Sequence, residues 1–312
     1  SGPFESCMRI VRGLESFPPD AGPSAVALGV FDGIHLGHRA ILGTAVAQAR
    51  RHGLAALACT FEPHPVDVLQ PGRAPLPLTT LPERLELIEE SGIDTAVVIT
   101  FTPAVAAVEP EAFVRDVLVG TLRARHVVVG FNHRFGRGAR GDARLLEALG
   151  AELGFHAHVV PPTTVDGVPV SSSEIRAALQ AGDLPRAAKL LGRPYAVQGE
   201  VVRGVGRGRT LGFPTANVNS DRPLPLPAGV YACHAFLDTA RYRAVINLGV
   251  RPTFGGTELV VEAHLLDFSG DLYGRRIKLQ FLRRLRDEMR FPDVEALRTQ
   301  IAQDVAAARR DS

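Results

Sequence analysis

Two histidines stand in a setting that suits phosphate chemistry. They belong to the stretch Gly29-Val-Phe-Asp-Gly-Ile-His-Leu-Gly-His38, which follows an apolar run and leads into a predicted helix. A helix N-terminus offers free amide groups and a partial positive charge, so His35 and His38 can donate hydrogen bonds to a phosphate bound there. Glycines such as Gly37 permit tight turns and a close approach of the ligand. Incidental surface histidines or a metal pair are the alternatives, but no further metal ligands stand nearby in sequence.

A second polar segment, Ser171-Ser-Ser-Glu-Ile-Arg176, follows the last predicted strand of the same region and opens a helix. Serine can cap that helix, and its neighbours offer further hydroxyls to phosphate. Arg176 then lies in the first turn. An ordinary capped helix with an exposed arginine explains the segment about as well, so only its pairing with the histidine turn favours a phosphate site.

Aromatic residues follow two more predicted strands. They occur in Phe61-Glu-Pro-His-Pro65 and in Gly130-Phe-Asn-His-Arg-Phe-Gly136. Aromatic faces suit a flat heterocyclic ligand, but the same residues also fit turn chemistry and core packing. The residues alone leave both readings open.

Oxygen ligands and a glycine-rich stretch occur together near residues 199–217. The glycines allow backbone amides to converge on phosphates. Thr215 and Asn217 share a face if the chain is extended, and both offer neutral oxygens. Mg²⁺ prefers oxygen ligands and takes the rest from water and phosphates, so this pair suits an Mg-ATP complex. Taken alone, Gly204-x-Gly206-x-Gly208 is equally consistent with a plain loop.

A carboxylate stands on the polar face of a later strand. Alternating apolar residues from Leu259 to Leu265 put Glu262 and His264 together on the opposite face. An inert surface pair is the default interpretation. Beside an ATP site, the carboxylate could instead take the proton from an attacking hydroxyl.

The elements that position these residues alternate in the first half of the chain. Apolar β-rich runs are predicted at residues 25–31, 54–61, 95–101, 126–131 and 156–160, with helical patterns between them. Continuous apolar runs are typical of parallel strands covered on both faces, so we predict a doubly wound α/β sheet. Ligands of such sheets bind at the carboxyl ends of the strands.

The pattern changes at Gly192-Arg193-Pro194, after two short predicted helices at residues 174–181 and 184–191. Short β-like runs from 195 to 285 and a helix at 294–309 predict a small β-barrel with a terminal helix. The expected domains are therefore 8–182 and 195–312, joined by a linker at 183–194. Residues 1–7, which open on Ser1-Gly2-Pro3, are interpreted as an expression remnant, with Met8 as the native start.

Composition excludes several classes of function. The formal net charge of +2 over 312 residues gives no reason to expect nucleic acid as a partner, and no apolar stretch approaches the length of a membrane helix. Three cysteines without pairwise spacing fit a reducing compartment, so we expect a cytoplasmic protein. The only lysines, Lys189 and Lys278, lack the context that a Walker loop or a protein-kinase site requires. The oligomeric state is left open.

The histidine turn and the Ser171–Arg176 segment together resemble the nucleotidylyltransferase superfamily, whose signatures are His-x-Gly-His and a Ser/Thr-rich segment ending in Ile-Arg. The resemblance implies a Rossmann-like domain in which His35 and His38 stabilise charge on the transferring phosphate and Arg176 acts on the leaving pyrophosphate. Nucleotide and phosphate contacts are implied at Gly29, Phe31, Gly37, Ser171, Ser172 and Ser173.

The whole chain is similar to the prokaryotic bifunctional riboflavin kinase and FAD synthetase family. The further matching motifs are Gly-Arg-Thr-Leu-Gly-Phe-Pro-Thr-Ala-Asn217, Gly229-Val-Tyr231, Asn247-Leu-Gly-Val-Arg-Pro-Thr253, Glu262-Ala-His-Leu-Leu-Asp-Phe268 and Asp271-Leu-Tyr-Gly274. The resemblance implies ATP, riboflavin and FMN as substrates, with Mg²⁺ bound at Thr215 and Asn217 and Glu262 as the base on riboflavin. It also implies phosphate contacts at Gly204, Arg207, Gly208, Arg209 and Pro214, and flavin or adenine contacts at Phe61, Phe131, Asn132 and Phe135.

Some positions depart from the commonest family pattern. Many relatives have an acidic residue and an aromatic residue where this chain has Asn132 and His133, and threonine where it has Ser173. Two other functions are alternatives: adenylylation of another acceptor, such as pantetheine phosphate or a phosphorylated alcohol, and a non-enzymatic flavin carrier or regulator. The C-terminal motifs argue against the first, and the intact set His35, His38, Thr215, Asn217 and Glu262 argues against the second.

Overall fold

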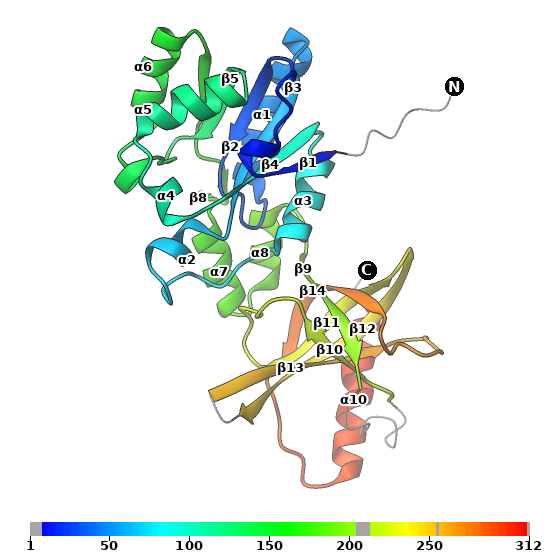
Figure 1. Cartoon of the computed structure of the whole chain (residues 1–312). Coiled ribbons are helices and arrows are strands. Elements are labelled where there is room, and N and C mark those ends of the chain that lie inside the picture. The colour runs from blue at the N-terminus through cyan, green and yellow to red at the C-terminus, as the bar shows by residue number, and fades with distance from the viewer. Residues whose placement is uncertain (1–7, 204–212, 254–255, 311–312) are drawn as a thin grey trace, which may run out of the picture. The chain divides into compact units, whose positions relative to one another are not determined.

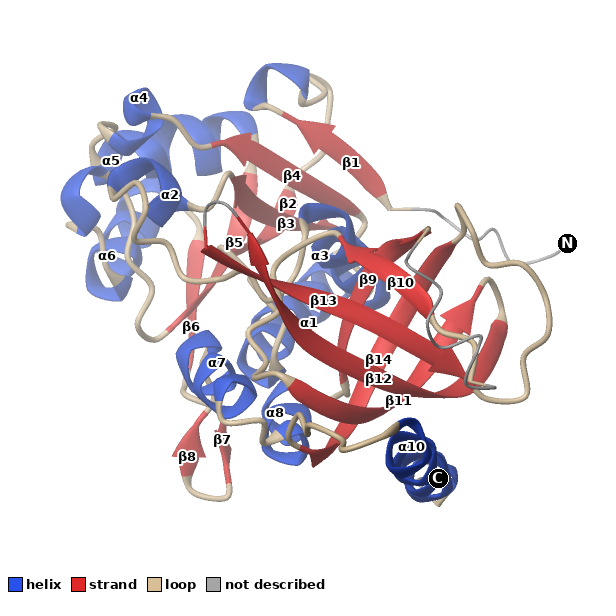
Figure 2. Cartoon of the chain, turned by 90° about the horizontal axis from the view of Figure 1, so that it is seen from below, coloured by secondary structure: helices blue, strands red, loops and turns tan. Residues whose placement is uncertain are grey.

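A computed structural model describes residues 8–203, 213–253 and 256–310 of the chain. The chain folds into two compact units. The first contains Ser1–Pro75 and Thr79–Ser171, and the second contains Leu76–Leu78 and Ser172–Ser312. Each unit is built around its own sheet (Figures 1 and 2).

The first unit contains a six-stranded parallel sheet with the strand order β1-β4-β3-β2-β5-β6. Its strands are β1 (Arg9–Arg12), β2 (Ser24–Leu28), β3 (Ala55–Glu62), β4 (Thr95–Thr100), β5 (Ala124–Gly130) and β6 (His156–Val160). All five predicted strands are confirmed. The edge strand β1 was missed because only Val11 of its four residues is buried, so the sequence shows no apolar run there.

Alternate residues of β2 explain why the sheet is covered on both faces. Val26 and Leu28 belong to one hydrophobic cluster, whereas Ala25 and Ala27 belong to another. The first cluster includes residues of the π-helix η2 (Phe113–Thr121) and of α6 (Ala143–Leu153). The second includes residues of α1 (Leu36–His52) and α3 (Leu81–Glu90). The predicted doubly wound sheet is therefore confirmed.

Shorter elements complete the first unit. They are the helices α2 (Pro65–Leu69), α4 (Pro103–Ala106) and α5 (Pro110–Ala112), the 3₁₀ turns η1 (Leu14–Ser16) and η3 (Arg137–Ala139), and the hairpin of β7 (Thr164–Val165) and β8 (Val168–Pro169).

The turn after β2 occupies a special place in this sheet. From β2 the chain proceeds through β3 to β4 on one side, and later returns to β5 on the other side. The strand order therefore reverses at β2. Ligands of open α/β sheets bind outside the carboxyl ends of the strands at such a reversal. Residues 29–38 follow β2 at this point.

The second unit contains a closed antiparallel barrel with the strand order β10-β13-β12-β11-β14-β9. Its strands are β9 (Tyr195–Val202), β10 (Ala216–Ser220), β11 (Gly229–Leu237), β12 (Ala240–Thr253), β13 (Gly256–Leu265) and β14 (Arg276–Arg286). The helix α10 (Val294–Arg309) packs on β11 and β12. The predicted barrel with a terminal helix is confirmed.

Two helices precede the barrel, α7 (Ser172–Gln180) and α8 (Leu184–Leu191). They pack on one another, and α8 also packs on β9 and β14. The segment predicted as a linker at 183–194 thus contains α8, whose leucines are buried. The domain boundaries stay a prediction.

Candidate functional site

The first predicted site is centred on two stacked imidazoles. His35 is the N-cap of α1, and its Nδ1 accepts a hydrogen bond from the His38 backbone N–H at 3.2 Å. The two rings stack with centroids 3.6 Å apart and an interplanar angle of 16°. Because Nδ1 of His35 is an acceptor, the neutral ring carries its proton on Nε2. A phosphate at this helix N-terminus would therefore find an imidazole donor as well as amide groups.

Glycine leaves room for neighbouring rings at two positions of this turn. A Cβ at Gly37 would lie 3.1 Å from the His35 ring, and a Cβ at Gly29 would lie 2.9 Å from the Phe31 ring. Phe31 itself is fully buried and has a φ of +57°, a conformation that a bulky residue adopts only when its surroundings enforce it. Its ring meets His38 edge-on, with centroids 5.4 Å apart. Close packing thus fixes the imidazoles.

The serine-rich segment begins beside this turn and continues into the second unit. A Cβ at Gly37 would lie 3.8 Å from the carbonyl oxygen of Val170, so the residue before Ser171 lies next to the histidine turn. Ser172 and Ser173 open α7. Arg176 lies in its first turns, and its Nε donates to the carbonyl oxygen of Leu76 at 2.7 Å. The phosphate roles of this segment stay predictions.

The four residues predicted to contact flavin or adenine fall into two pairs. Phe131 and Asn132, which follow β5 directly, are exposed, Phe131 by 51%. Phe61 and Phe135 are less than a tenth exposed and belong to the core cluster, where Phe61 packs edge-on against Phe101. The accessible ring is therefore that of Phe131. A flavin or adenine role for any of the four stays a prediction.

The second predicted site is a row of polar side chains across three neighbouring barrel strands. Asn217 of β10 lies directly opposite Glu262 of β13, and Glu262 lies directly opposite Asn247 of β12. Residues directly opposite one another in an antiparallel pair share a face of the sheet. All three side chains are half-buried. The neighbouring row, made of Val218, Val261 and Leu248, is buried.

The polar row stands on the outer face of the barrel. Val230 lies opposite Asn247 in the register and packs in a cluster with Val245 and with Ala308 of α10. Helix α10 therefore covers part of the face on which Glu262 stands, over β11 and β12. Val230 in turn lies opposite Arg286, which forms a partly buried ion pair of 2.8 Å with Asp304 of α10. The predicted alternation around Glu262 is confirmed.

His264 holds the chain next to the polar row. Its Nδ1 lies 2.8 Å from the carbonyl oxygen of Pro214, and its ring meets Phe213 edge-on at 5.6 Å. The imidazole therefore donates from Nδ1 and fixes the segment that leads into Thr215. Sequence reasoning placed His264 beside Glu262 but gave it no role.

Asn247 is the candidate site residue that sequence reasoning missed. Its motif was recognised, but its place beside Glu262 depends on the pairing of β12 with β13, which a linear pattern does not reveal. A Cβ at Gly249 would lie 3.2 Å from a carboxylate oxygen of Glu288 and 3.7 Å from the amide nitrogen of Asn247. A second carboxylate therefore lies close to this row. The predicted phosphate contacts Gly204, Arg207, Gly208 and Arg209 lie outside the described residues.

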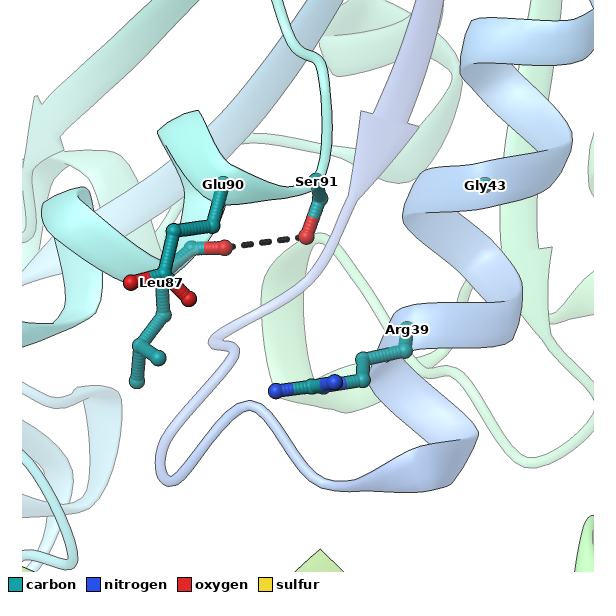
Figure 3. A pocket seen from close by; sticks show the side chains of 5 residues that line it. All are labelled: Arg39, Gly43, Leu87, Glu90 and Ser91. Carbon is teal, nitrogen blue, oxygen red and sulfur yellow. Dashed lines mark hydrogen bonds between the residues drawn. The ribbon is translucent and has the colours of Figure 1, made fainter. Parts of the chain in front are cut away.

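A pocket of about 210 Å³ lies between α1 and α3. Figure 3 shows Arg39 reaching from α1 toward α3, where Leu87, Glu90 and Ser91 complete the lining. The Ser91 hydroxyl donates to the carbonyl oxygen of Leu87 at 2.9 Å. The residues that line this pocket, which also include Gly43, are distinct from those predicted for the two sites.

These observations define a class of protein with two separate candidate ligand sites. A helix N-terminus with two imidazoles lies at the reversal point of a parallel sheet, where ligands of such sheets bind, and a carboxylate lies between two amides on a barrel.

Comparison with known proteins places the chain within that class. Residues 18–174 match the family model for FAD synthetase, and residues 191–311 match the family model for riboflavin kinase. The bifunctional riboflavin kinase/FMN adenylyltransferase of Escherichia coli K12 is 38% identical over 97% of both chains. The enzyme of the same name from Bacillus subtilis is 38% identical over 90% of both. The chain belongs to the bifunctional riboflavin kinase/FMN adenylyltransferase family.

A solved structure supports the fold over the full length. It comes from Streptococcus pneumoniae, is 30% identical, and matches with a TM-score of 0.90 over 98% of this chain and 100% of its own. Its title describes a macrolide-efflux protein, whereas the curated relatives are named by the two enzyme activities. Within the described parts of this chain, no helix is both long and apolar enough to cross a membrane.

Proposed function

We propose that this chain converts riboflavin to FMN in its barrel unit and FMN to FAD in its α/β unit, using ATP in both steps. In the first step the riboflavin 5′-hydroxyl oxygen bonds to the γ-phosphorus and ADP leaves. In the second step a phosphate oxygen of FMN bonds to the α-phosphorus and pyrophosphate leaves. Family membership supports both steps, and the observation that carries the residue assignment is the Asn217–Glu262–Asn247 row.

Glu262 is the base of the kinase step. Its carboxylate stands between two amide side chains on the outer face of the barrel, only half-buried and therefore able to reach a substrate hydroxyl. The carboxylate accepts the proton as the 5′-oxygen bonds to phosphorus. The neighbouring amides hold the carboxylate and the substrate hydroxyl in a fixed position relative to one another. Positioning of this kind is the main contribution of a protein to phosphoryl transfer.

Magnesium fits the donor set next to Glu262. Thr215 supplies a hydroxyl and Asn217 an amide oxygen, and both are hard oxygen ligands. The hydrogen bond from His264 to the carbonyl oxygen of Pro214 fixes the backbone immediately before Thr215. When bound with ATP, the ion would neutralise charge on the phosphates. We assign Thr215 and Asn217 to hold it.

His35 and His38 act in the adenylylation step. The stacked pair at the N-terminus of α1 presents imidazole donors where the amide groups of the helix already favour an anion. Donors aimed at the α-phosphate stabilise the charge that develops there in the transition state. Gly29, Phe31 and Gly37 shape the turn. Exposed Phe131 offers a ring face to the flavin or the adenine.

A single time course tests both steps. The purified chain is incubated with riboflavin, ATP and Mg²⁺, and riboflavin, FMN and FAD are resolved chromatographically. We expect FMN to appear first and FAD after it, and FMN supplied alone with ATP to yield FAD and pyrophosphate. FMN formation without FAD would remove the second activity from the proposal. A cytoplasmic location and the absence of nucleic-acid and membrane partners stay predictions from composition.

A further inference from the structure

Two side chains at the start of α3 are hydrogen-bonded to the histidine turn, residues 29–38. Thr79 stands two residues before the helix, and Arg84 lies at its fourth position. Both are almost completely buried, at 4% exposure each. We call Thr79 and Arg84 the α3 clamp.

Thr79 forms three hydrogen bonds with the turn. Its backbone N–H and its hydroxyl both donate to Oδ1 of Asp32, at 3.1 and 3.2 Å. The same hydroxyl accepts a hydrogen bond from the backbone N–H of Gly33 at 3.1 Å. Asp32 is only 5% exposed, so this carboxylate depends on protein donors. The hydroxyl of Thr79 therefore connects a side chain and a backbone amide of the turn.

Arg84 joins the ends of two parallel strands. Its Nη1 donates to the carbonyl oxygens of Val30, at 3.2 Å, and Phe61, at 3.0 Å. Its Nη2 forms an ion pair of 2.9 Å with Glu62. The planar guanidinium reaches these three groups at once, which a single ammonium group does not reproduce. The end of β2 is thereby fixed to the end of β3.

The clamp bonds lie on both sides of Phe31. Arg84 holds the preceding residue, Val30, while Thr79 holds the two following residues. Phe31 itself has a φ of +57°, and its ring supports His38. A bulky residue keeps such a backbone only when its neighbours are fixed. The clamp therefore supplies the constraint that keeps Phe31 against the stacked imidazoles.

We propose that Thr79 and Arg84 are positioning residues for adenylyl transfer, acting through Phe31 and His38. This inference rests on the proposed function of the first unit. Loosening the clamp should leave ATP binding largely intact and misplace the imidazoles in the transition state. Small misplacements of catalytic groups are costly in rate, so the effect should fall on kcat rather than on KM.

The test compares two adjacent threonines. Thr79→Val keeps the branched shape and removes the hydroxyl, and it should lower kcat for FMN adenylylation about 10- to 100-fold with little change in the KM for ATP. Thr79→Ser restores the hydroxyl and should restore kcat. Thr80→Val is the matched control, because Thr80 only caps α3 in a capping box with Glu83. It should lower the Tm and leave kcat unchanged, and riboflavin phosphorylation should be normal in all three variants.

Arg84→Lys provides an independent test of the α3 clamp if Thr79→Val does not fold. It keeps the charge near Glu62 but loses the bridge between the two carbonyls, so kcat for adenylylation should again fall. Wild-type kcat in folded Thr79→Val, or equal losses of kcat in Thr79→Val and Thr80→Val, would overturn the inference. A wild-type chain that makes no FAD would instead overturn the proposed function itself.

Discussion

The two candidate sites obtain their geometry in opposite ways. The adenylyltransferase site is local in sequence, because residues 29–38 carry most of it, but its backbone is strained and depends on side chains from α3. The kinase site is dispersed, because Asn217, Asn247 and Glu262 come from three strands, but the regular ladder places them without strain. A strained turn needs support from outside itself, whereas a ladder position needs only the correct strand pairing.

This comparison predicts that the two activities can be lost separately, which is the largest effect we expect. Glu262→Gln keeps the shape but removes the base, so FMN formation should fall about 100- to 10,000-fold while FMN supplied directly still becomes FAD. His38→Ala should do the reverse and lower FAD formation about 100- to 1,000-fold, so that FMN accumulates from riboflavin. Product analysis with each substrate measures both effects.

Parallel loss of both reactions in either folded variant would contradict the two-site description. A single shared centre would then have to replace it. Circular dichroism and the Tm of each variant establish that the chain is folded before the activities are compared.

The different character of the two sites also explains what the sequence could reveal. Five of the six strands of the parallel sheet were predicted from apolar runs and the barrel from short β-like runs, and the local motif around His35 needed no tertiary information. Asn247, Thr79 and Arg84 could not be assigned roles, because they act through strand pairing or through bonds to residues 22 to 54 positions away. The core position of Phe61 and Phe135 was likewise invisible to a pattern that fits pockets and cores equally.

A substitution of Arg176 tests whether the first site includes this residue of α7. Its motif assigns it to the leaving pyrophosphate, yet its Nε donates to Leu76 of the second unit. Arg176→Lys should still lower FAD formation about tenfold at limiting ATP, because one ammonium does not reproduce a planar fork on two phosphate oxygens. Riboflavin phosphorylation should be unchanged. Initial rates of pyrophosphate release check the first expectation, and wild-type rates would remove Arg176 from the site.

Asn217→Ala sharpens the description of the kinase site. On the proposed assignment, the alanine removes an oxygen ligand from a cation that has few protein ligands, while the strand and its register are kept. The Mg²⁺ concentration for half-maximal FMN formation should rise several-fold, on the order of fivefold. Asn219→Ala is the matched control, two residues further along β10 and exposed. Superimposable Mg²⁺ titrations for wild type and Asn217→Ala would count against a metal ligand there.

The smallest effect concerns acid stability and again separates the two units. His126 lies among His52, His156 and His158 of the first unit, and its Nδ1 is 2.9 Å from Nε2 of His158. Burial, followed by the neighbouring histidines, lowers the pKa of His126 from 6.5 to about 4. The unfolded chain therefore binds this proton more readily, so the stabilisation by the neutral ring is complete above pH 6.5 and is lost as the pH falls toward 4. Between about pH 7.5 and about pH 5 the free energy of unfolding of the first unit should fall by about 1 kcal/mol on this account, since solvent screens part of the effect.

His126→Gln keeps a polar group and cannot titrate, so its urea midpoint, followed by the loss of FAD formation, should depend less on pH than that of the wild type. Equal pH dependence in the two proteins would show that the histidine cluster does not govern the acid sensitivity of the first unit.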